Sequence, residues 1–244
     1  MNRRHGSTEG VERRRFLQIA GVGACSTVIS GAVAAEPPSP PKPENVLSPD
    51  DALKRLLEGN RRYVAGTSRR HDFKAEREAL TTGQNPFAAV LSCADSRIAP
   101  EYAFDSSRGD LFVVRVAGNF ATADGIASLE YAVEVLGTPL ILVLGHEACG
   151  AIDATIKSVK EGSTLPGHLP SLVENLRPAV EAVMKKPGDV LHDALRKNVL
   201  LTVEKLKTAP PILSKAAESG KVRVVGGVYR LADGEVELLT PRQI

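Results

Sequence analysis

Three short apolar runs, separated by segments of helical periodicity, are the feature that most constrains the fold of this 244-residue chain. The runs cover residues 87–92, 111–116 and 140–144. Between the last two, residues 123–137 have helical spacing and end in a glycine. Strands that alternate with helices form a parallel sheet with right-handed crossovers. We therefore expect an α/β fold, with a central, mostly parallel β-sheet flanked by helices.

Further helices and a hairpin are expected on both sides of these runs. Ser48 is a suitable N-cap and Pro49 a suitable first residue for a helix. The pattern predicts further helices over 73–82, 150–161, 171–185 and 189–207, and a hairpin-like pair of strands over 222–239 around an Asp-Gly turn.

The N-terminal residues have the layout of a secretory signal peptide, which we place at 1–35. A basic start is followed by an apolar, glycine-rich middle from Phe16 and by small residues before a proline-rich run. The pair Arg13-Arg14, followed by another arginine, Phe16 and Leu17, resembles a bacterial twin-arginine signal. The mature protein is therefore expected to be periplasmic or secreted, without a membrane span.

Two other interpretations of the N-terminal segment stay open. A single membrane anchor is disfavoured because glycines, serines and a threonine weaken a short apolar run. Acylation of Cys25 would make a lipoprotein, although only nine residues separate it from Arg15. After the signal we expect a proline-rich, extended linker at 36–47 and one catalytic domain at 48–244.

Removing the signal peptide changes the charge and the cysteine content of the chain. The formal net charge falls from +2 to −1, because residues 1–35 contain five arginines and two glutamates. Charge therefore gives no reason to expect nucleic acid or an anionic membrane as a partner. Cys93 and Cys149 are then the cysteines of the mature chain.

Chemically reactive residues follow two of the expected strands. Cys93, Asp95 and Arg97 stand at alternate positions after the first run, so they can share one side of an extended segment. His146 and Cys149 follow the third run at a spacing that joins their side chains across one turn. The carboxyl edge of a parallel sheet, where both groups would lie, is where ligands bind.

Two cysteines and a histidine form a three-ligand zinc set that leaves the fourth position open, as in catalytic sites. A disulfide between Cys93 and Cys149 is the alternative in an exported protein. A disulfide would not need the adjacent ion pair of Asp95 with Arg97.

Four runs carry a family resemblance: "CADSR" at 93–97, "VVRVAGN" at 113–119, "GHEACGA" at 145–151 and "VVGGVYRLADGEVELL" at 224–239. In their order and separation, over about 48–240, they resemble the β-class carbonic anhydrases of the plant-like type. The resemblance implies N-terminal helices that pack on a partner subunit and self-association as a homodimer or tetramer.

The same resemblance assigns the site residues. Cys93, His146 and Cys149 would bind one Zn²⁺ per chain, with Asp95 and Arg97 as the catalytic dyad. Gln84, Phe112 and Tyr131 would line the carbon dioxide and bicarbonate pocket. Without the resemblance, the residues themselves favour the simpler interpretation, in which Gln84 is an exposed residue at a helix end and the two aromatic residues belong to the core. The remaining histidines lack ligand spacing and are expected at the surface: His5, His71, His168 and His192.

The implied reaction is the reversible hydration of carbon dioxide. Zinc lowers the pKa of bound water from 15.7 to roughly 7, and the resulting hydroxide would attack carbon dioxide beside the two aromatic side chains. Asp95 would accept a hydrogen bond from the reacting group, and Arg97 would keep Asp95 ionised. Hydrolysis of carbon disulfide or carbonyl sulfide on the same site, and a non-catalytic periplasmic zinc-binding or disulfide-stapled protein, stay as alternatives.

Replacing both Arg13 and Arg14 with lysine is expected to leave an active, zinc-loaded precursor in the cytoplasm. The twin-arginine route carries folded cargo, and a chain that folds in the cytoplasm acquires its metal while its cysteines are reduced. Cell fractionation with zinc analysis of each pool measures this. Normal export of the double-lysine variant would mean that the general secretion route serves the protein.

Overall fold

The protein is described by a computed structural model over residues 40–240, so the predicted signal peptide and Cys25 lie outside the described residues. Its centre is a five-stranded sheet in the order β2-β1-β3-β4-β5. The first four strands are parallel, and β5 runs antiparallel to β4. The strands are β1 (Ala88–Ser92), β2 (Leu111–Arg115), β3 (Leu140–His146), β4 (Arg223–Tyr229) and β5 (Val236–Leu239). The expected mostly parallel sheet and the C-terminal hairpin are confirmed.

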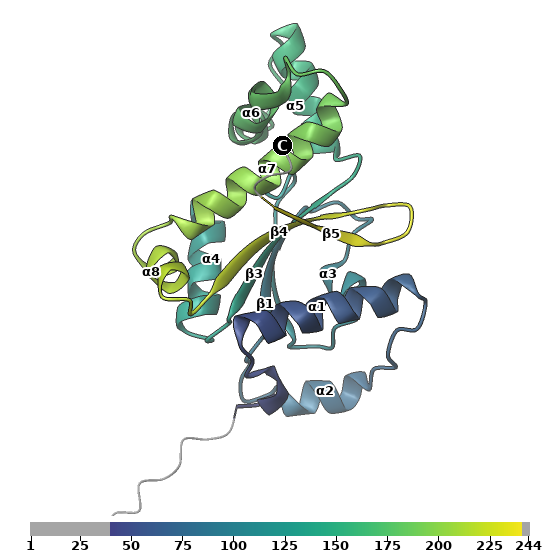
Figure 1. The fold of residues 1–244 in the computed structure, drawn as a ribbon, viewed down its shortest axis with the longest axis vertical. Coiled ribbons are helices and arrows are strands. Elements are labelled where there is room, and N and C mark those ends of the chain that lie inside the picture. Colours follow the sequence, from purple (N-terminus) through teal and green to yellow (C-terminus); the bar gives the residue numbers. More distant parts are fainter. Residues whose placement is uncertain (1–39, 241–244) are drawn as a thin grey trace, which may run out of the picture. The chain divides into compact units, whose positions relative to one another are not determined.

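Helices cover both faces of this sheet. They are α1 (Pro49–Val64), α2 (Phe73–Ala79), α3 (Pro100–Ala103), α4 (Ala123–Glu134), α5 (Gly150–Glu161), α6 (Pro170–Val183), α7 (Val190–Lys207) and α8 (Ile212–Glu218). Residues of α4 to α8 contribute to the hydrophobic core on one face, while α1 and α3 contribute to the core on the other. Figure 1 shows α1 and α7 on opposite sides of the strands.

The strand sequences explain this two-sided burial. Successive side chains of a strand point to opposite faces. In β3, Ile141 and Val143 therefore pack under α4 to α8, whereas Leu140 and Leu142 pack with α1, and all four are fully buried. A strand buried on both faces has a continuous apolar sequence, as found in parallel sheets.

Most expected helices are present, with shorter or additional segments in places. The Ser48 side chain accepts a hydrogen bond from Asp51 N, so it caps α1 as expected. Helix α2 ends at Ala79, three residues earlier than expected, and α4 ends at Glu134, before the αL glycine Gly137. The short helices α3 and α8 were not expected. Within residues 40–240, no helix combines the length and apolar character of a membrane span.

The N-terminal helices were expected to pack on a partner subunit. In the structure, α1 buries Ala52, Leu53 and Leu56 against the sheet of its own chain. Helix α2 buries none of its residues, and Phe73 at its start is 61% exposed. Packing of these helices on a partner stays a prediction, and α2 is the helix that has a face available for it.

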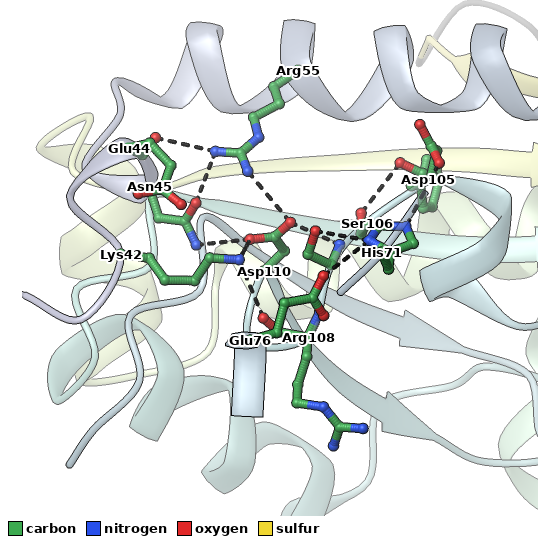
Figure 2. Close-up of polar contacts among 12 residues, drawn as sticks. Lys42, Glu44, Asn45, Arg55, His71, Glu76, Asp105, Ser106, Arg108 and Asp110 are labelled. Atoms are coloured by element: carbon green, nitrogen blue, oxygen red, sulfur yellow. Dashed lines mark hydrogen bonds and ion pairs between the residues drawn. The ribbon is translucent and has the colours of Figure 1, made fainter. Parts of the chain in front are cut away.

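The expectation of an extended linker is wrong for its described end. Pro43–Asn45 form a 3-10 turn, η1, and Asn45 is buried. The carboxylate of Asp110, which lies just before β2, accepts hydrogen bonds from Lys42 Nζ and Asn45 Nδ2 and pairs with Arg55 of α1 at 3.3 Å (Figure 2). A buried anion needs such partners, so this segment is fixed to the fold.

A second buried carboxylate organises the chain between α1 and α2. Asp105 accepts hydrogen bonds from Arg62 Nε and from Arg69 N. His71, expected at the surface, instead lies half-buried in this region, with Nδ1 at 3.1 Å from both Glu76 Oε1 and Ser107 Oγ (Figure 2). The loop between α3 and β2 thus holds the N-terminal part of the domain through ion pairs and hydrogen bonds.

Asp110→Asn is expected to lower the free energy of unfolding by about 3 kcal/mol, because it leaves buried donors and cations without their anion. Glu134→Gln is the matched control. The Glu134–Lys221 pair is half-exposed on both sides, so its loss is expected to cost about 0.5 kcal/mol or less. Denaturant unfolding of both variants measures the difference. Equal stabilities would show that Asp110 does not hold the N-terminal segment.

Candidate metal centre

The order of the strands places two chain segments at one point of the sheet. From β1, the chain crosses to β2 on one side, while β3 pairs with β1 on the other side. A crevice forms outside the carboxyl ends of the strands at such a switch in direction. Cys93 directly follows β1, and His146 is the last residue of β3. The sequence-predicted cysteine and histidine are therefore brought together by topology.

Cys93, His146 and Cys149 form a compact buried cluster. One ligand atom of each lies within 4.8 Å of the others, and all three residues are at most 3% exposed. Cys93 and Cys149 are free cysteines, so the disulfide expected as an alternative is not present. The cluster brings together the donor types of a Cys₂His zinc site.

The imidazole of His146 is oriented for a metal. Its Nδ1 lies 2.8 Å from the Glu147 carbonyl oxygen, which can only accept, so Nδ1 carries the proton. The other nitrogen, Nε2, is buried and has no hydrogen-bond partner. A buried acceptor without a partner is costly. A metal ion bound by Nε2 and the two neighbouring cysteine sulfurs would supply the missing partner.

A strained turn joins two of the three ligands. Ala148, between His146 and Cys149, has a φ of +49°, a left-handed conformation that is rare outside glycine. The turn places Cys149 at the N-cap of α5. The positive end of the helix dipole favours a thiolate there.

Cys93 and Cys149 lie close together, and the pKa values of the two thiols are shifted in opposite directions. The hydrogen bond from Cys149 lowers the pKa of Cys93, with further lowering by His146 and by the Gly118 N–H, which lies 3.2 Å from Cys93 Sγ. The same hydrogen bond and burial raise the pKa of Cys149.

Asp95 and Arg97 form a bidentate ion pair next to the cluster. Arg97 Nε and Nη2 lie 2.9 and 2.7 Å from the two oxygens of Asp95. These hydrogen bonds hold the pKa of Asp95 well below its usual range. Asp95 Oδ2 is 3.8 Å from His146 Nε2, so an ionised carboxylate faces the position of a metal.

Arg115 is a site residue to which the sequence analysis assigned no role. From the end of β2 its guanidinium donates to the carbonyl oxygens of Cys93, Asp95 and Ile98, at 2.8 to 3.0 Å. The planar guanidinium of Arg115 thus makes three hydrogen bonds to the segment that carries Cys93, Asp95 and Arg97, and these bonds hold that segment in place. The sequence feature that could have predicted a role for Arg115 is its position as a charged residue near the carboxyl end of the apolar run 111–116.

The three predicted pocket residues lie away from the cluster of their own chain. Gln84 is exposed, four residues before β1, at a surface cavity of 740 Å³. Phe112 pairs with Ala89, which is about 13 Å from Cys93 at roughly 3.3 Å per residue. The rings of Phe112 and Tyr131 are 6.3 Å apart, so these two residues are brought together. Their role in substrate binding stays a prediction.

A buried Cys₂His cluster at the switch point of a parallel sheet, beside a carboxylate–guanidinium pair, is the arrangement expected of an α/β enzyme with a metal centre. Comparisons with known proteins identify the family within this class. The sequence profile described as "Carbonic anhydrase" matches residues 88–236. A carbonic anhydrase of Mycolicibacterium smegmatis is 40% identical over 192 residues, which cover 78% of this chain and 93% of the relative.

Two solved structures agree with this assignment. The β-carbonic anhydrase of Coccomyxa, in complex with acetazolamide, is 28% identical with a TM-score of 0.61, over 77% of this chain and 86% of that chain. A tetrameric β-carbonic anhydrase of Sordaria macrospora shares the fold, at 22% identity and a TM-score of 0.60 over 78% of this chain and 97% of that chain. The chain belongs to the β-class carbonic anhydrase family.

His146→Ala and Cys149→Ser are each expected to abolish zinc retention, because each removes one of three protein ligands. His192→Ala is the control, since this histidine is half-exposed and lies outside the cluster. Zinc content per chain after dialysis, measured by atomic emission, separates the variants. Full zinc occupancy in His146→Ala would exclude the ligand assignment.

Proposed function

We propose that the protein is a zinc-dependent enzyme that reversibly hydrates carbon dioxide to bicarbonate and a proton. Family membership supports the reaction. The observation that carries the proposal for this chain is the buried cluster of Cys93, His146 and Cys149 beside the ionised Asp95. The three side chains are the metal ligands in this proposal, and Asp95 with Arg97 is the catalytic dyad.

Zinc bound by these side chains supplies a Lewis acid that ionises a water molecule near neutral pH. The protein's own contribution is to orient the reacting group. Asp95 is held ionised by Arg97, so its Oδ2 can only accept a hydrogen bond. An acceptor at this place turns the proton of a hydroxyl group toward Asp95 and leaves an oxygen lone pair free for carbon dioxide.

Arg97 also opposes direct ligation of a metal by Asp95. Both carboxylate oxygens accept from the guanidinium, and the Arg97 N–H donates to Oδ1 at 2.9 Å. Arg97 Nη2 lies 3.2 Å from the Ala148 carbonyl oxygen as well, which ties the dyad to the turn between His146 and Cys149. A metal-ligating Asp95 would have to give up these bonds, so we propose that the fourth position stays open.

The pocket residues point to self-association. Phe112 and Tyr131 lie far from the cluster of their own chain, so contact with carbon dioxide requires a second copy that offers them to its partner's site. Tyr131 is 47% exposed, and Val135, the C-cap residue of α4, is 62% exposed. We propose a homodimer or tetramer. A monomer in sedimentation experiments that hydrates carbon dioxide at full rate would exclude this arrangement.

The location of the enzyme is a second part of the proposal. The basic, apolar and small-residue parts of 1–35 support export to the periplasm or beyond, already folded. Zinc thiolates need reduced cysteines, which the cytoplasm provides before export.

Asp95→Asn is expected to retain zinc and to lose about 100-fold or more of the hydration rate, because an amide can donate to the reacting oxygen and misorient it. Asp153→Asn on the exposed face of α5 is the matched control. Stopped-flow hydration assays, with and without a chelator, are combined with zinc analysis. Wild-type turnover in Asp95→Asn would reduce Asp95 to a structural partner of Arg97. A zinc-loaded wild-type protein that does not hydrate carbon dioxide, and instead hydrolyses carbonyl sulfide or does neither, would overturn the proposed function.

A further inference from the structure

The loop between β2 and α4, residues 116–121, lies between a proposed metal ligand and helix α7. Its start continues the pairing with β1, because Val116 N donates to Ser92 O at 3.1 Å. Two residues on, Gly118 N–H donates to Cys93 Sγ at 3.2 Å in a buried hydrogen bond. One face of the loop therefore contacts the Cys93 sulfur directly.

Helix α7 holds the other side of the same loop at two carbonyl groups. Asn198 Nδ2 donates to Gly118 O at 2.8 Å, and Lys205 Nζ donates to Ala121 O at 2.7 Å. Asn198 is only 3% exposed, and a buried amide of this kind requires partners. Its bond to Gly118 joins positions that are 80 residues apart in the sequence.

Gly118 is where these contacts meet. Its φ is +88°, and a Cβ built on it would lie 2.8 Å from Leu176 Cδ1 of α6. The residue is thus confined by α6, bonded through its carbonyl to α7, and bonded through its N–H to Cys93. Because glycine has no side chain to fix its conformation, the two hydrogen bonds determine the orientation of its peptide groups.

We propose that Asn198 is a positioning residue for the metal centre, which holds Gly118 so that the Gly118 N–H stays bonded to the Cys93 sulfur when a metal is bound. The inference rests on the zinc site of the proposed function. An N–H donor at a metal-bound thiolate withdraws negative charge from the sulfur and so tunes the metal through its ligand. Asn198 reaches the metal in this way without touching it.

The test uses the full-length protein with Co²⁺ in place of zinc, because the sulfur-to-cobalt charge-transfer band reports the charge on the ligand sulfur. In Asn198→Leu the Gly118 N–H is released, the sulfur becomes more electron-rich, and the band is expected to move to longer wavelength. The affinity for zinc, measured by competition with a chelator, is nevertheless expected to fall about tenfold, because Cys93 loses a partner that orients it for the metal. Asn198→Ser, whose hydroxyl is too short to reach Gly118, is expected to give the same change with less disturbance of packing.

Lys205→Met is the matched control. It removes the other bond from α7 to this loop, yet it leaves Gly118 and Cys93 with their partners. If Asn198 acts through the Gly118 N–H, the cobalt band of Lys205→Met stays at the wild-type wavelength. An equal shift in Lys205→Met, or an unshifted band in folded Asn198→Leu and Asn198→Ser, would overturn the inference.

A measurement on the unmodified sequence covers the case in which both Asn198 variants fail to fold. In ¹⁵N-labelled protein loaded with ¹¹³Cd, the Gly118 amide proton is expected to show a scalar coupling to the metal through the Cys93 sulfur. No coupling at Gly118, with metal bound, would overturn the inference. Failure of the proposed function looks different: the wild-type protein would then bind no cobalt, or would bind it and hydrate no carbon dioxide.

Discussion

The parallel pairing of β1 with both β2 and β3 is the constraint on which the rest of the structure depends. It brings the ends of three strands to one edge, so that Cys93, Arg115 and His146 meet although they are far apart in the sequence. The cost of this arrangement is a sheet buried on both faces, which the continuous apolar sequences of β1 and β3 satisfy. The cluster is thus a product of strand order rather than of any local turn alone.

Rigidity around the cluster comes from hydrogen bonds to backbone groups. Arg115 donates to three carbonyl groups of the segment after β1, and Arg97 donates to the carbonyl of Ala148. The Glu147 side chain accepts from Leu231 N at 3.0 Å, which ties the turn after β3 to the C-terminal hairpin. Each loop of the site is therefore fixed by a side chain from a different element, as a preorganised metal site requires.

Features that depend on residues close together in the sequence could be predicted from it, whereas features that depend on contacts between distant residues could not. Alternation of Cys93, Asp95 and Arg97, and the short spacing of His146 and Cys149, are local patterns, and the structure brings these residues together. The bond of Asn198 to Gly118 has no local pattern, since a polar residue within a helix most often faces solvent. Proline-rich composition indicated an extended segment before α1, but one distant carboxylate, Asp110, fixes it. Single long-range partners of this kind leave no periodicity in the sequence.

Burial of both cysteines also ties metal loading to acidity. Cysteine binds a metal as the thiolate, so any proton that the two buried sulfurs hold must leave when a divalent ion enters. Competition between the ion and those protons makes the apparent affinity rise with pH. An acidic compartment would therefore act on the cluster as a chelator does, by drawing the ion out of the protein.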